Sequence, residues 1–139
     1  MNLTIDTFAW LELIRGTTAG AVVRTAIEEA NETLTPSIVL AEIAGACHRT
    51  GFSHDLIARE LAAIGEASTI VQIDFGVALA AAGALDELRT ISKARKMPLP
   101  GLADALILAT ARVKHARLLT GDPHFRGMPE TVWVQQSRS

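Results

Sequence analysis

The chain has 139 residues and a mass of 14.8 kDa, with 13 basic and 15 acidic side chains and a formal net charge of −2. This length suggests one domain spanning residues 1–139, and 49% hydrophobic with 20% charged residues supplies enough apolar side chains for a folded core, which excludes intrinsic disorder. A mildly acidic chain with two Trp, four Phe and no Tyr cannot bind nucleic acid by bulk charge or broad stacking alone.

Targeting and membrane-spanning signals are missing from the sequence. Residues 1–6 contain no basic segment followed by an apolar one, so they do not resemble a signal peptide. The longest stretch without charged or polar side chains, residues 75–85, has 11 residues, well short of the roughly 18 that a membrane span needs. The one cysteine, Cys47, cannot form an intramolecular disulfide. We therefore expect a cytoplasmic protein with no membrane contact.

Hydrophobic periodicity predicts short strands that alternate with helices. The expected strands are residues 3–5, 33–35, 70–73, 117–120 and 132–134. Helices are expected near residues 8–15, 19–30, 37–50, 54–64, 75–96 and 102–115, with a loop or short helix at 121–126. Thr7, Ser53 and Asp74 are the expected N-caps of three of these helices. The Ala-rich helix from residue 75 is expected to be buried in the core or at a subunit contact.

The alternation of strands and helices predicts a mostly parallel sheet of four to five short strands, covered on both faces, because parallel neighbours need crossover connections. In such α/β sheets, ligands bind beyond the carboxyl ends of the strands, where the strand order reverses. We therefore look for functional side chains at the strand ends.

Four acidic residues fall at these positions: Asp6, Glu42, Asp104 and Asp122. Any one of them could be a helix cap or a solvated surface acid. Four carboxylates that converge on one crevice repel each other, however, and a bound cation would relieve that repulsion. Oxygen ligands alone favour a hard cation, Mg²⁺ or Mn²⁺, over zinc.

The other side chains narrow the chemistry of this site. The four histidines have no zinc-ligand spacing, and His124 alone is close in sequence to one of the four acids. No Gly-rich phosphate loop is present, and Asp6 is not followed two residues later by a second Asp, which weakens the NTPase and phosphatase interpretations. Carboxylate-held Mg²⁺ is suited to hydrolysing phosphodiesters with a metal-activated water.

Four stretches of the sequence resemble the PIN-domain ribonucleases, and within them the VapC toxins of toxin-antitoxin systems. The similarity spans the chain in the order and spacing of that family. The matching stretches are Ile5-Asp6-Thr7, residues 35–43 (TPSIVLAEI), residues 102–111 (LADALILATA) and residues 119–125 (LTGDPHF).

The resemblance implies a three-layer α/β/α fold, Mg²⁺-dependent endoribonuclease activity on an RNA substrate, a homodimer and inhibition by a cognate VapB-like antitoxin. It also implies that Asp6, Glu42, Asp104 and Asp122 are catalytic and hold the metal. Thr120 matches a hydroxyl residue that supports the last acid.

One position departs from the family pattern. Phe8 stands where many members carry a small Ser, so we expect Phe8 to pack inward and Thr7 to supply a supporting hydroxyl instead.

Two questions stay open from the sequence. Seven of the 13 basic residues form two groups, Arg89 to Lys96 and Arg112 to Arg117, and each group could either contact RNA or complement a helix C-terminus. The departure at Phe8 also keeps an alternative function open, a non-catalytic PIN-like module that binds RNA or protein.

Overall fold

A five-stranded parallel sheet forms the centre of the computed structural model, which describes residues 1–137. The strands are β1 (Asn2–Ile5), β2 (Glu32–Pro36), β3 (Thr69–Val71), β4 (Arg117–Thr120) and β5 (Thr131–Trp133). They lie in the order β3-β2-β1-β4-β5, and every neighbouring pair is parallel. The predicted sheet is therefore confirmed. The last two residues of the expected domain, 138–139, lie outside the described part of the chain.

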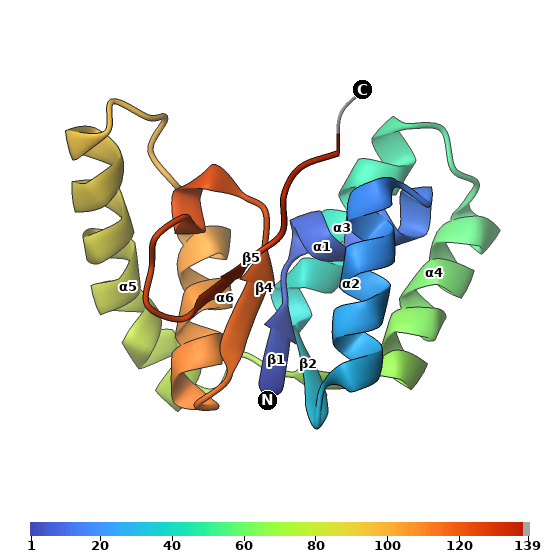
Figure 1. Cartoon of the computed structure of the whole chain (residues 1–139), viewed down its shortest axis with the longest axis horizontal. Helices are drawn as coiled ribbons and strands as arrows, with labels where there is room; N and C mark the ends of the chain where they lie inside the picture. The colour runs from blue at the N-terminus through green and yellow to red at the C-terminus, as the bar shows by residue number, and fades with distance from the viewer. Residues whose placement is uncertain (138–139) are drawn as a thin grey trace.

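Six helices cover the two faces of the sheet. They are α1 (Thr7–Arg15), α2 (Thr18–Glu29), α3 (Ser37–Arg49), α4 (His54–Ala67), α5 (Phe75–Ala94) and α6 (Leu102–Val113), and the 3₁₀ helix η1 (Pro123–Phe125) follows β4. Figure 1 shows α1 to α4 on one side of the sheet and α5 with α6 on the other. Right-handed crossovers produce this arrangement, because the chain moves from β1 to β3 in one direction and then returns past β1 to β4. The fold is the expected three-layer α/β/α sandwich.

Side-chain caps set where several helices begin. The Ser53 hydroxyl accepts a hydrogen bond from the backbone N–H of Leu56 at the start of α4, and the Asp74 carboxylate accepts one from Val77 at the start of α5. These caps satisfy backbone donors that have no partner inside the helix. Both were expected from the sequence.

The predicted cap of α1 is wrong. Asp6, not Thr7, is the N-cap, and its Oδ1 accepts the Ala9 N–H at 2.8 Å. Asp6 still has the extended backbone of the strand, the conformation that an N-cap needs, whereas Thr7 is already the first residue of the helix. The Thr7 hydroxyl is thereby available to another acidic residue, Glu42.

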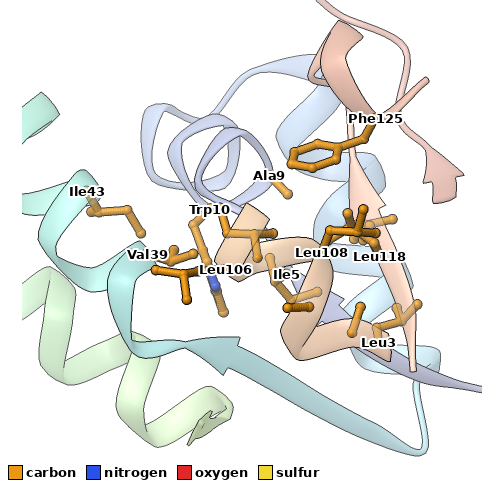
Figure 2. Packing of buried hydrophobic residues seen from close by; sticks show 14 of the residues in the cluster. Leu3, Ile5, Ala9, Trp10, Val39, Ile43, Leu106, Leu108, Leu118 and Phe125 are labelled. Carbon is orange, nitrogen blue, oxygen red and sulfur yellow. The ribbon is translucent and has the colours of Figure 1, made fainter. Parts of the chain in front are cut away.

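The main hydrophobic core lies between the sheet and the helices on its two faces. Figure 2 shows Ile5 of β1 and Leu118 of β4 among side chains from α1, α3 and α6. Trp10 is 3% exposed, and its indole N–H donates to the Thr35 hydroxyl at 3.0 Å, so its polar atom is satisfied inside the core. This packing fixes α1 and α3 against the strands that they follow.

The Ala-rich helix α5 is buried on one face only. Val77, Ala81 and Leu88 belong to the core, as expected. Phe75 and Leu79, however, are 97% and 80% exposed, so this second face is not part of the core, and the expected alternative, a subunit contact, stays a prediction. Among the helices of residues 1–137, none combines the length and the apolar character needed to cross a membrane.

The strand order reverses at β1, which lies between β2 and β4. The chain leaves β1 toward α1 on one face, whereas the helix that leads into β4 covers the other face (Figure 1). The carboxyl ends of β1, β2 and β4 therefore border the position where ligands bind in sheets of this type.

Candidate functional site

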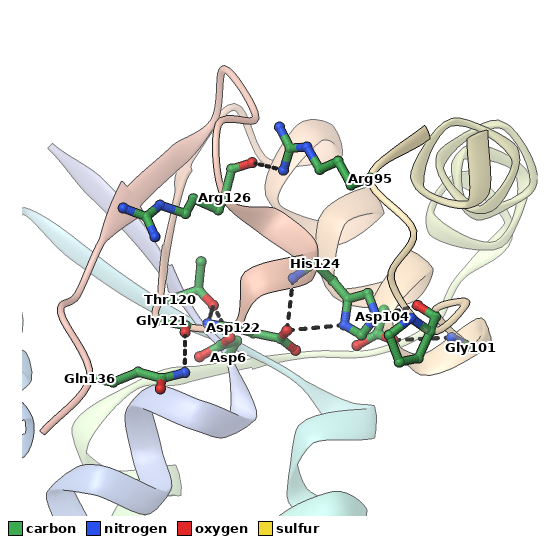
Figure 3. A network of polar contacts seen from close by, with 11 residues as sticks. Asp6, Arg95, Gly101, Asp104, Thr120, Gly121, Asp122, His124, Arg126 and Gln136 are labelled. Atoms are coloured by element: carbon green, nitrogen blue, oxygen red, sulfur yellow. Dashed lines mark hydrogen bonds and ion pairs between the residues drawn. The ribbon is translucent and has the colours of Figure 1, made fainter. Parts of the chain in front are cut away.

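The structure brings the four predicted acidic residues to the carboxyl edge of the sheet. Asp6 follows β1, Asp122 lies two residues after β4, and Glu42 lies in the second turn of α3. Asp104 lies in the first turn of α6, which runs antiparallel to the strands and therefore begins at this same edge. Figure 3 shows Asp6, Asp104 and Asp122 in one view.

A buried hydroxyl connects two of these acids. Thr120, the last residue of β4, is fully buried and donates its hydroxyl hydrogen to Asp6 Oδ2. The Thr120 hydroxyl oxygen in turn accepts the backbone N–H of Asp122 at 3.0 Å. Thr120 therefore orients the Asp6 carboxylate and holds the backbone of Asp122, and its supporting role in function stays a prediction.

Asp6 is buried next to other negative charges. Its side chain is 2% exposed, and burial raises the pKa of this carboxyl from 3.8 to about 7. Hydrogen bonds from Thr120 and Ala9 lower the pKa, whereas the charges of Asp122 and Glu42 raise it. A carboxylate without a cation is therefore unfavourable at this position.

Glu42 is oriented from the neighbouring helix. The Thr7 hydroxyl at the start of α1 donates to Glu42 Oε1 at 2.5 Å and connects α1 to α3. Thr7 thus contacts an acidic side chain, and its supporting role in function stays a prediction. Because Thr7 directly follows Asp6, this bond also couples the position of Glu42 to that of Asp6.

Asp104 closes the site from the opposite face of the sheet. Its Oδ2 accepts the Gly101 N–H at 3.1 Å, which fixes the loop that precedes α6. Burial raises the pKa of Asp104, and Asp122 and Glu42 raise it further against the opposing effects of Gly101 and His124. The four acids therefore act on one another electrostatically.

His124 connects this site to the loop between α5 and α6, a role that sequence reasoning missed. Its Nδ1 lies 3.1 Å from Asp122 Oδ1, and its Nε2 lies 2.8 Å from the Pro98 carbonyl oxygen. Burial lowers the pKa of His124, but Pro98 and Asp122 outweigh this effect and raise it, because both ring nitrogens face acceptors. The only sequence signal was that His124 lies two residues after Asp122.

The backbone between Thr120 and Asp122 is tightly enclosed. A Cβ atom at Gly121 would lie 2.3 Å from Phe8 Cε1 and 2.5 Å from the Val134 carbonyl oxygen, so only glycine fits there. Phe8 therefore packs inward, against this backbone. Gln136 donates from Nε2 to the Gly121 carbonyl oxygen at 3.2 Å and borders the site (Figure 3). Nothing in the sequence singled out Gln136.

The acids share one edge but do not form a finished cage. Within residues 1–137, no three His, Cys, Asp or Glu side chains are already placed to share one metal ion. Three of the acids are instead oriented by hydrogen bonds to Ala9, Gly101 and His124. Cation binding at this edge would need side-chain rotation.

The sequence as a whole carries the features of one protein family. The sequence matches the PIN domain family over residues 3–130. This chain belongs to the PIN domain family. The family resemblance expected from the four sequence stretches is confirmed. No curated protein sequence matches the chain significantly.

Solved structures share this PIN fold over nearly the whole chain. A toxin-antitoxin complex from Klebsiella pneumoniae is 23% identical, with 94% of this chain and 95% of that chain covered and a TM-score of 0.70. VapBC2 from Rickettsia felis, bound to a promoter DNA fragment, is 18% identical over 96% and 97% of the two chains, with a TM-score of 0.68. VapC20 from Mycobacterium tuberculosis, described as a Sarcin-Ricin loop cleaving toxin, is 15% identical over 98% and 99%, with a TM-score of 0.66. At these identities the likeness establishes the fold.

The raised pKa of Asp6 makes the stability of this PIN domain depend on pH. Between the unfolded pKa of 3.8 and the folded pKa of about 7, the folded state binds a proton that the unfolded state lacks, so stability falls as the pH rises through this range. Asp6→Asn removes this titration and keeps the Oδ1 acceptor for Ala9. We expect the Tm advantage of Asp6→Asn over the wild type to grow by about 5 °C or more between about pH 5 and pH 8.

Thermal unfolding followed by circular dichroism in EDTA measures this difference. Asp86→Asn, on the exposed surface of α5, is the matched control and should give the same small difference at both pH values. A Tm advantage of Asp6→Asn that does not change with pH would contradict the burial of a charged Asp6.

Proposed function

We propose that this PIN domain is a metal-dependent endoribonuclease that acts as the toxin of a toxin-antitoxin pair. The observation that carries the proposal is the buried Asp6 carboxyl, oriented by Thr120 and flanked by the charges of Asp122 and Glu42. Asp6 caps α1, but burial and like charges both disfavour its ionised form, so a neutral capping residue would serve the fold better. Acids kept together at this cost indicate a functional site.

The side chains at this edge fit a hard divalent cation. The donors are carboxylate oxygens, which suit Mg²⁺ or Mn²⁺, and Asp6, Asp104, Asp122 and Glu42 would hold the ion. When bound, such an ion activates a water molecule and stabilises the charge that develops during phosphodiester hydrolysis.

The chain's own residues prepare the site for this reaction. Thr120 and Thr7 hold Asp6 and Glu42 from adjacent elements, so these two carboxylates keep a fixed relation. The His124 ring lies against Asp122, with Nδ1 3.1 Å from Oδ1, and a proton taken up there would compensate part of the negative charge of Asp122. The packing of Phe8 against Gly121 excludes water from the inner side of this backbone.

One observation favours a second candidate, a non-catalytic PIN-like module that binds RNA or protein. Three of the acids are already hydrogen-bonded to groups of this chain, and residues 1–137 contain no ready-made set of three metal ligands. In this alternative the acids cap helices and fix loops. RNA turnover in the presence of metal distinguishes the two functions.

Replacing Asp104 tests the enzymatic proposal. Asp104→Asn keeps an oxygen that can accept the Gly101 N–H, so the start of α6 is preserved while one negative charge is removed. Removing a group that only supports a metal ligand lowers metal affinity or activity about 10–100-fold. Asp104 is proposed as a ligand itself, so we expect the rate of RNA cleavage in Mg²⁺ or Mn²⁺ to fall at least about 100-fold. Gel analysis of labelled RNA incubated with protein and metal, and with EDTA, measures this loss.

The Asp86→Asn protein should cleave RNA like the wild type and serves as the control. Cleavage that persists in Asp104→Asn or in EDTA would contradict a metal-dependent site.

The toxin role predicts that a small VapB-like antitoxin binds this chain and stops its RNA cleavage. Co-expression with a small protein encoded beside this chain tests that role. If the two proteins form no complex, the toxin role is contradicted.

The chain is also proposed to form a homodimer. Phe75 and Leu79 lie one turn apart on α5, are 97% and 80% exposed, and adjoin Ile73, which is 46% exposed. A second copy related by twofold symmetry would bury the same side chains on both partners.

Light scattering should give twice the chain mass for the wild type. The double variant Phe75→Ser/Leu79→Ser should be a monomer with an unchanged circular dichroism spectrum, because neither side chain contributes to the core. Val22→Ser, an exposed apolar position on α2, is the control and should stay dimeric. A monomeric wild type would contradict this proposal.

A further inference from the structure

The structure separates the two groups of basic residues that the sequence left equivalent. Arg112 is at the end of α6, where it forms ion pairs with Glu87 at 2.7 Å and Glu130 at 2.8 Å. Arg117 begins β4 and donates to the carbonyl oxygens of Glu130 and Thr131. Both lie at the amino edge of the sheet, opposite the acidic site, and hold the structure together. This group is therefore not placed to bind a substrate of the site.

The other group lies at the carboxyl edge. It comprises Arg89, Lys93, Arg95 and Lys96, from the last turns of α5 and the residues that follow, and the fold adds Arg126 from the segment after η1. We call these five residues the basic strip. All five are exposed. Within residues 1–137, no carboxylate lies within ion-pair distance of any of them. Their charge is not compensated by contacts of the described chain.

Hydrogen bonds attach the basic strip to the elements that carry the acids. Arg95 Nη1 donates to the Arg126 carbonyl oxygen at 2.8 Å, and Arg126 directly follows η1, the short helix that Asp122 caps (Figure 3). Arg89 Nε donates to the Pro100 carbonyl oxygen at 3.3 Å. Pro100 precedes Gly101, whose N–H donates to Asp104. The basic strip therefore borders the acidic site.

Lys96 carries positive charge where stability alone would favour another residue. It has a φ of +55°, a left-handed conformation at the end of α5 that favours glycine. Arg126 lies over the Trp133 ring, 4.9 Å from its centroid, while its backbone carbonyl oxygen accepts from Arg95 (Figure 3). Both arginines are exposed and have no carboxylate of the described chain within ion-pair distance.

We propose that the basic strip binds the phosphate backbone of single-stranded RNA and leads it into the acidic site. The inference rests on the proposed ribonuclease function. A polyphosphate chain is repelled by Asp104 and Asp122, so a bordering surface of opposite charge is what holds it near the site. Leu99, on the loop between α5 and α6, and Leu102, at the start of α6, are each more than half exposed and offer apolar contact to unstacked bases.

Binding is measured without metal, so that it is independent of cleavage. Fluorescence anisotropy with a labelled mixed-sequence single-stranded RNA in EDTA, at about 50 to 200 mM salt, gives the affinity and its salt dependence. Arg95→Gln/Arg126→Gln should bind at least about tenfold more weakly and lower the salt slope by about 1.4, since each contact to a single strand contributes about 0.7.

A second pair of variants separates folding from binding. Lys96 and His115 both end a helix with a left-handed backbone, at φ +55° and +52°, but His115 lies at the amino edge after α6. Replacing either residue by glycine should raise the Tm, because glycine adopts this conformation without strain. Lys96→Gly should also weaken RNA binding severalfold, whereas His115→Gly should leave it unchanged.

The outcomes distinguish this inference from the proposed function. If the basic-strip variants bind and cleave RNA as well as the wild type, the inference is overturned and the ribonuclease function stands. Metal-free binding that depends on the basic strip, without any metal-dependent cleavage, would support the inference and overturn the enzymatic function. A wild type that neither binds nor cleaves RNA would overturn both.

Discussion

The Asp6 carboxyl is the group on which the account of the site depends. It caps α1 through one oxygen and accepts the Thr120 hydroxyl through the other, so it joins β1, α1 and β4 at one point. It does so while buried next to Asp122 and Glu42, which raise its pKa together with burial. The same carboxyl is thus both the cap of α1 and a charge that burial disfavours, and a bound divalent cation would relieve the electrostatic cost.

Topology explains why these charges meet. The reversal of strand order at β1 gathers the ends of β1 and β4 with the start of α6. Within the described residues, Arg112 forms ion pairs with Glu87 and Glu130 at the opposite edge, and His124 contacts Asp122 at this edge. The charged side chains of the described residues therefore differ between the two edges of the sheet. The amino edge holds the ion pairs of Arg112 with Glu87 and Glu130, whereas the carboxyl edge holds four acids, with His124 as their one basic contact in the described chain, beside the basic strip, which has no ion pair there. An anionic polymer with a metal ion matches the second edge.

Local patterns in the sequence predicted much of this structure. The strand ends, the caps Ser53 and Asp74 and the four acids all depend on short-range signals, namely apolar periodicity and polar residues at element boundaries. The cap of α1 was mistaken by one residue, because Asp6 and Thr7 are both good caps and only the backbone conformation decides between them. The contacts of His124 with Pro98, of Gln136 with Gly121 and of Arg95 with Arg126 join segments far apart in the chain, and nothing in the sequence specified them.

Calorimetric titration with Mn²⁺ tests most directly whether the acidic edge is a cation site. Because the pKa of Asp6 is about 7, an ion that binds there displaces its proton. At about pH 6, titrations in buffers of different ionisation enthalpy should show release of close to one proton per bound ion for the wild type, and weaker binding without this release for Asp6→Asn. Binding of Mn²⁺ with equal affinity and no proton release in both proteins would contradict the account.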